Sequence, residues 1–185
     1  MTLADTAPVR LHVPARSLVL VAGLPGAGKS TLLGTLAPDP TVVVLDSDAA
    51  RGRLSARLPE RTPYGLYRWL VHLLHRCDAV RVALTGPDTV VVHLPATGHR
   101  IRSGVLALAR LSGREAHLLW VHAEPSEALD GQHVRGRVVR DAAFSGHAAK
   151  AGLVVDALRT GPPPGWVSAR VVDRACARRG LALDK

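Results

Sequence analysis

Residues 23–30 combine glycines, a lysine and a serine in a spacing suited to binding phosphate. They read GLPGAGKS and fit the pattern G-x-x-x-x-G-K-[ST] at every fixed position. Glycines let the backbone curl so that its N–H groups converge on phosphate oxygens. Lys29 would reach the β- and γ-phosphates, and the Ser30 hydroxyl would bind Mg²⁺. We therefore predict a nucleotide site formed by Gly23, Leu24, Pro25, Gly26, Ala27, Gly28, Lys29, Ser30 and Thr31.

Two aspartates, Asp46 and Asp48, directly follow an apolar run that is typical of a buried strand. In parallel α/β sheets, ligands bind at the carboxyl ends of strands, so both carboxylates would lie near the phosphate loop. Asp48 could accept a proton from a substrate hydroxyl, and Arg51, one helical turn later, could hold a polar or anionic part of that substrate. The alternative is that Asp46 or Ser47 caps the next helix and that Asp48 and Arg51 form a surface pair.

Apolar runs alternate with helical patterns along the chain. Buried strands are predicted at residues 17–22, 41–45, 89–94, 117–122 and 167–172. Helices are predicted at residues 31–37, 49–58, 63–84, 101–111, 125–134 and 142–158, with a further short helix in the tail. This alternation predicts one α/β domain over residues 1–185, with a parallel sheet covered on both faces. Residues 1–16 are expected to be an irregular lead.

The predicted helix at residues 63–84 carries apolar residues at helical spacing. These are Leu66, Leu70, Leu73, Cys77, Val80 and Leu84. We expect this face to pack against the core, with Cys77 as a packing residue. His72 and His75 have a spacing that can bind metal, but no cysteine or carboxylate lies near them in the sequence, so a place on the helix surface is favoured.

Composition places the chain among globular proteins. Its 185 residues are 47% hydrophobic and 21% charged, which excludes a disordered chain or a fibre. The longest apolar runs are too short to cross a bilayer, and two cysteines fit a reduced compartment, so we expect a cytoplasmic protein that does not contact a membrane. The net charge of +9 suggests anionic partners. Nucleic acid stays possible, although scattered arginines and 3% aromatic residues weigh against direct binding.

The phosphate loop, followed by a strand that ends in D-x-x-R, resembles the P-loop kinases of AAA type that include polynucleotide 5′-hydroxyl kinases, chloramphenicol phosphotransferase and zeta toxins. The resemblance covers residues 17–139. It implies a three-layer P-loop NTPase domain whose five-stranded parallel sheet has the strand order 2-3-1-4-5. It also implies that Asp48 is the general base, that Arg51 contacts the acceptor, and that a small lid at about residues 135–147 places Arg135 and Arg137 over the phosphates.

The sequence departs from this family at two positions. His93 stands where the third strand of the family commonly ends in an acid that helps to organise Mg²⁺, and an imidazole is a poor ligand for that ion. Gly131 stands near the place of the first lid arginine, for which Arg137 and Arg140 could compensate. His99 and Arg100 match the basic turn after the third strand and could touch the acceptor or ATP.

The expected function is transfer of the ATP γ-phosphate to a hydroxyl acceptor, either a small molecule or a nucleic-acid end. The expected cofactors are ATP and Mg²⁺, with Ser30 and Asp46 as the candidate metal ligands. The alternative is a nucleotide-binding or ATPase module that regulates a partner, which His93 in place of an acid favours. Neither the acceptor nor the oligomeric state follows from the residues.

Overall fold

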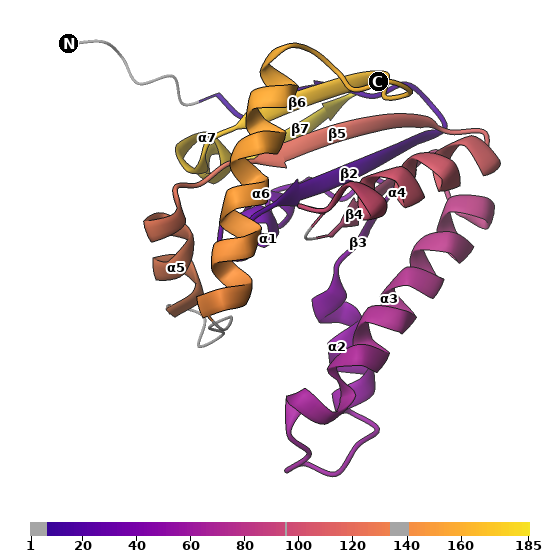
Figure 1. The fold of residues 1–185 in the computed structure, drawn as a ribbon. Coiled ribbons are helices and arrows are strands. Elements are labelled where there is room, and N and C mark those ends of the chain that lie inside the picture. Colours follow the sequence, from indigo (N-terminus) through magenta and orange to yellow (C-terminus); the bar gives the residue numbers. More distant parts are fainter. Residues whose placement is uncertain (1–6, 95, 134–140) are drawn as a thin grey trace.

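The structure is a computed structural model that describes residues 7–94, 96–133 and 141–185. Its centre is a five-stranded parallel sheet (Figure 1). From one edge to the other, the strands are β3 (Val42–Leu45), β4 (Thr89–His93), β2 (Ser17–Gly23), β5 (Glu115–Val121) and β6 (Ser168–Val172). Counted along the chain among these five, the order is 2-3-1-4-5, so the predicted order is confirmed.

The central strand β2 explains why its sequence is a continuous apolar run. Every residue from Ser17 to Gly23 is buried, because strands lie on both sides of β2 and helices cover the sheet. Leu18 pairs with Val90 of β4 and with Ala116 of β5, and the other strand pairs keep this parallel register. All carboxyl ends of these strands therefore meet at one edge of the sheet.

The helices around the sheet include α1 (Lys29–Leu33), α4 (His99–Leu111), α5 (Pro125–His133), α6 (Asp141–Arg159) and α7 (Arg174–Arg179). Helix α4 packs against β5 and β2, α6 packs against β6, and α7 packs against α1. Among the residues that the structure describes, no helix is long and apolar enough to cross a membrane.

Residues 1–16 were predicted to be irregular, and this prediction is wrong for residues 9–12, which form a strand. Strand β1 (Val9–His12) pairs in parallel with β7 (Leu181–Asp184), and the two form a separate two-stranded sheet. Val9 and Leu11 point inward and are buried, whereas Arg10 and His12 point outward. Four residues of alternation are too short a pattern to predict a strand, and the pairing partner lies near the other end of the chain.

Helices α2 (Ser47–Ser55) and α3 (Tyr64–Thr85) form an arm that extends beyond the end of the sheet (Figure 1). The two helices share a small core of their own, built from Ala50, Leu54 and Val71 with Tyr64, Tyr67, Leu70 and Leu74 packed around it. Arg53 of α2 also forms an ion pair with Asp78 of α3.

The packing of α3 differs from the sequence prediction. Its buried residues are Val71, His75, Ala79, Val82 and Ala83, whereas most of the predicted core face, Cys77 included, is exposed. Helix α3 carries two apolar stripes with the same period, and periodicity alone does not say which stripe meets the protein. His75 is not on the helix surface either, because its Nε2 lies 3.0 Å from the carbonyl oxygen of His93 inside the protein.

Candidate functional site

The phosphate loop connects β2 to α1 and lies directly against α5. Gly26 has φ +90°, and a Cβ there would come closer than 3.0 Å to the carbonyl oxygen of Ala128. A side chain is therefore excluded at Gly26 both by the backbone conformation and by the neighbouring helix. The glycine that the motif predicted is required for the shape of the loop.

The side chain of Lys29 binds the backbone at the start of the phosphate loop. The side chain is 5% exposed, and Nζ donates hydrogen bonds to the carbonyl oxygens of Gly23 at 3.0 Å and Leu24 at 2.6 Å. A single positive charge is thus fixed between the end of β2 and the start of α1. The structure places Lys29 at the loop, as the motif predicted.

Helix α5 explains the glycine found near the place of the first lid arginine. A Cβ on Gly131 would come closer than 3.0 Å to the carbonyl oxygen of Gly26. The next residue, Gln132, donates from Nε2 to the carbonyl oxygen of Pro25 at 3.1 Å. No side chain fits at position 131, because the helix and the loop touch there through their backbones.

An arginine that the sequence analysis missed lies beside the loop. Arg174 begins α7 and donates to the carbonyl oxygen of Glu127 in α5. It lines a cavity of about 320 Å³ together with Gly26, Gly28, Thr31, Gly131 and Arg178. Arg174 follows the carboxyl end of β6, so the rule about strand ends that singled out Asp46 could also have found it.

The two arginines at the end of α7, Arg178 and Arg179, have different surroundings. Arg178 is exposed but lies on the wall of this cavity. Arg179 is half-buried, and its Nη2 lies 2.6 Å from Sγ of Cys176.

Asp46 and His93 lie side by side because their strands are neighbours. Leu45 pairs with Val92 across β3 and β4, so the next residue of each strand reaches the same edge. Oδ1 of Asp46 is 3.1 Å from Nδ1 of His93. The same Oδ1 accepts the backbone N–H of Asp48 at 3.1 Å, so Asp46 caps α2.

The electrostatics of this pair favour an anion beside a neutral ring. Burial raises the pKa of Asp46, but His93, the amide of Asp48 and the Ser30 hydroxyl together lower that pKa below its usual range. Burial lowers the pKa of His93, the charge of Lys29 lowers it further, and Asp46 only partly opposes this. At neutral pH, Asp46 is therefore a carboxylate and His93 a neutral imidazole.

Asp48 and Arg51 lie at the start of the arm. Asp48 is exposed in the first turn of α2. The guanidinium carbon of Arg51 is 4.5 Å from the centre of the Tyr64 ring, which is a cation–π contact with the first residue of α3. Tyr64 in turn meets Tyr67 edge to face, with ring centres 5.4 Å apart. Arg51 is thus held where the two helices of the arm meet.

Comparison with known proteins agrees with this architecture. The profile of one protein family, described as an AAA domain, matches residues 18–159. The chain belongs to the AAA-domain family. A search of curated proteins gives no match for this AAA-domain protein.

The fold is similar to solved structures of low sequence identity. One is a chain from the PezAT chromosomal toxin–antitoxin system of Streptococcus pneumoniae, with a TM-score of 0.62 and 13% identity, over 90% of this chain and 71% of that chain. Another is a protein assigned as a kinase, from Chloroflexus aurantiacus, with a TM-score of 0.59 and 16% identity, over 86% and 89% of the two chains. The predicted P-loop kinase-like fold is confirmed.

The predicted lid of the AAA-domain protein is described only in part. Arg135, Arg137 and Arg140 lie outside the described residues. Residues 141–147 begin α6, and Phe144 is buried in the main core. Nδ1 of His147 lies 2.8 Å from Oγ1 of Thr97, which connects α6 to the turn before α4. His99 and Arg100 are exposed in the first turn of α4.

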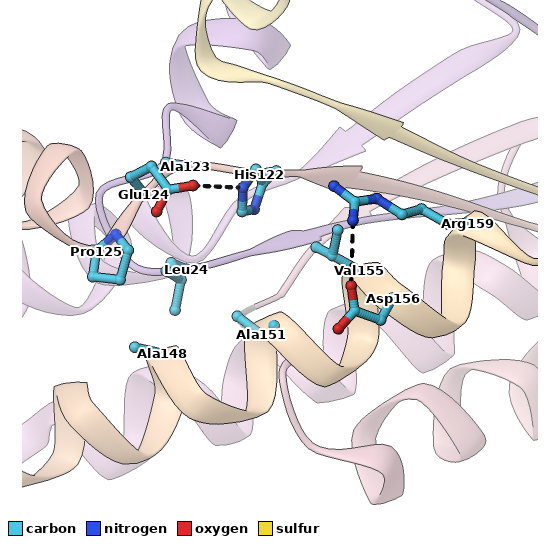
Figure 2. A pocket seen from close by; sticks show the side chains of 11 residues that line it. Leu24, His122, Ala123, Glu124, Pro125, Ala148, Ala151, Val155, Asp156 and Arg159 are labelled. Carbon is cyan, nitrogen blue, oxygen red and sulfur yellow. Dashed lines mark hydrogen bonds and ion pairs between the residues drawn. The ribbon is translucent and has the colours of Figure 1, made fainter.

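A second cavity, of about 300 Å³, lies between α6 and the turn that follows β5 (Figure 2). Leu24 of the phosphate loop forms part of its wall. The charged groups around it form pairs, with 3.3 Å between His122 and Glu124 and 3.4 Å between Asp156 and Arg159. Two carboxylates repel phosphate, so the cavity lined by Arg174 suits a nucleotide phosphate better.

Proposed function

We propose that this AAA-domain protein binds ATP with Mg²⁺ at the phosphate loop and transfers the γ-phosphate to a hydroxyl acceptor. One observation carries the proposal. Two aspartates with different surroundings follow the same strand: Asp46 is half-buried beside His93, and Asp48 is exposed to solvent. Phosphoryl transfer needs an oxygen ligand for the metal and a separate group that accepts the hydroxyl proton, and these two residues can divide those roles.

The donor set at the loop fits Mg²⁺. The Ser30 hydroxyl and the Asp46 carboxylate are hard oxygen ligands, and the low pKa of Asp46 keeps it available as an anion. A bound Mg²⁺ would neutralise phosphate charge. Among the described residues, no group of three His, Cys, Asp or Glu side chains could hold a metal by itself. Phosphate and water oxygens would therefore complete the coordination.

The remaining roles follow from position and charge. Lys29 would exchange its carbonyl partners for charged phosphate oxygens, which are stronger acceptors. Arg174 and Arg178 would face the nucleotide from the opposite wall of the cavity. Asp48 would take the acceptor proton, and Arg51 would orient the acceptor beside the arm. Arg135 and Arg137 remain candidates for neutralising charge in the transition state.

A second candidate function is a nucleotide-binding or slow ATPase module that regulates a partner. The observation that favours it is that His93 stands at the end of β4, where the resembling kinases place an acid. An imidazole does not help to order water around Mg²⁺ as a carboxylate does.

The experiment follows the labelled γ-phosphate of ATP. The protein is incubated with ATP alone, with a 5′-hydroxyl oligonucleotide, and with mixtures of sugars, nucleosides and other hydroxyl compounds. A labelled product that Lys29→Ala and Asp48→Asn both abolish supports a kinase, and the mixture that yields it gives the acceptor class. Free phosphate as the sole labelled product in every mixture would favour the ATPase module.

A further inference from the structure

Helix α3 carries an apolar row on the side that faces away from the protein. We name this row the α3 ridge, and its members are Leu66, Trp69, Leu73, Cys77, Val80 and Leu84. Leu66 is 70% exposed, Trp69 65% and Leu84 55%. Each residue follows the previous one by three or four positions, so the six side chains form one continuous row on a straight helix.

Packing among the residues that the structure describes does not account for the ridge. It lies on the opposite side of α3 from Val71, His75, Ala79 and Val82, which hold the helix against α2 and the sheet. Six exposed side chains of this kind present apolar area on the order of 500 Å², as much as the largest patch of an ordinary monomer. A patch of that size on a well-anchored helix indicates a binding surface.

The charges beside the ridge restrict what can bind there. Asp78 is the single acidic residue in the sequence of α3, and it is paired with Arg53 and Arg81. Arg76 adds further positive charge along one edge of the ridge, since its helical position is next to that of Trp69 and Leu73. A second copy of this chain would bring like charges together, whereas a partner with acidic edges would complement them.

We propose that the α3 ridge binds an amphipathic helix of another protein, with apolar residues every three to four positions and Asp or Glu along both edges. A ridge one side chain wide fits the groove between the side-chain rows of a second helix. The 22 residues of α3 extend over about 33 Å, enough for six turns of contact. The ridge and its arginines together approach the roughly 800 Å² per partner of a standard interface.

The fluorescence of Trp69 reports binding at the ridge directly. Trp69 is 65% exposed, whereas Trp120 and Trp166 are 0% and 8% exposed. The probe is a synthetic 21-residue helical peptide with leucines at heptad spacing and glutamates on both edges. A control peptide keeps the leucines and carries lysines in place of the glutamates. We expect micromolar binding of the glutamate peptide with a blue shift of Trp69 emission, and at least tenfold weaker binding of the lysine peptide.

Two exposed leucines give matched variants. Leu73→Glu in the ridge should weaken binding of the glutamate peptide at least tenfold, whereas Leu153→Glu in α6, at a site 73% exposed, should not. Both variants should transfer phosphate like the wild type. A negative result in the peptide-binding test is therefore distinguishable from a negative result in the phosphate-transfer test of the proposed function. Equal binding of both peptides, no binding of either, ridge-dependent dimers in sedimentation, or ridge-dependent binding to phosphatidylserine vesicles would each overturn the proposal.

Discussion

Gly131 of α5 and Gly26 of the phosphate loop touch through their backbones, and no Cβ fits between them. Gly131→Ala is therefore expected to push the loop and α5 apart. We expect a stability loss of about 1–3 kcal/mol, as in other overpacked sites, and at least tenfold weaker ATP binding. Chemical denaturation and calorimetry measure the two effects. Gly146→Ala is the matched control, since it adds a methyl group to an open helix position and should leave ATP binding unchanged.

Substitution of Asp48 and substitution of Asp46 should have different effects on the protein. Asp48→Asn should reduce phosphate transfer about 10²–10⁴-fold, the contribution typical of a general base, with ATP affinity within about tenfold of the wild type. Asp46→Ala should cost about 1 kcal/mol of stability through loss of its cap on α2 and raise the Mg²⁺ concentration needed for activity. Transfer assays, Mg²⁺ titrations and melting curves separate the two. If Asp48→Asn loses stability and keeps activity, Asp48 is structural and the base lies elsewhere.

His93 should make stability depend on pH. Burial lowers its pKa in the folded chain, so between that pKa and the unfolded value of about 6.5 the unfolded chain binds the extra proton. The free energy of unfolding should therefore fall as the pH drops from 7 to 5. His93→Gln should reduce this fall, measured by urea denaturation at both values. Burial also lowers the pKa of His117, so part of the trend should remain. His99→Gln, which removes an exposed histidine, should follow the wild type.

Arg174 should contribute to ATP binding. Arg174→Ala removes a positive charge from the cavity and the hydrogen bond to the carbonyl oxygen of Glu127, and we expect about tenfold weaker ATP affinity by calorimetry. Arg159→Ala, at an exposed site on α6, is the control for loss of net charge. Equal affinity in the two variants would mean that Arg174 only joins α5 to α7.

Local pattern was enough to predict the strands of the main sheet and the glycine-rich loop after β2, whereas the strand order followed from the family resemblance. β2 is a continuous apolar run because it is central, and the glycines of the loop are needed at those positions whatever the rest of the chain does. The cap formed by Asp46 was among the predicted alternatives for the same reason, since a cap depends on neighbours in sequence.

Features that depend on distant partners could not be predicted in this way. The pairing of β1 with β7 and the contact of Arg174 with α5 join segments far apart in the chain. The inward face of α3 is a similar case. His75 is buried because the end of β4 accepts its hydrogen bond, while Leu66 and Leu73 stay outside although their spacing is that of a core face.

The two-stranded sheet of β1 and β7 joins segments that are made at different times during synthesis of the chain. Val9 and Leu11 leave the ribosome early, but their partners in β7 are made only after all five strands of the main sheet. Helix α7, which packs on α1 and β1 and carries Arg174, is produced just before β7. A nascent chain can thus form its phosphate loop long before the arginine wall of the cavity exists. The cavity that Arg174 lines is therefore complete only after translation has passed β6 and α7.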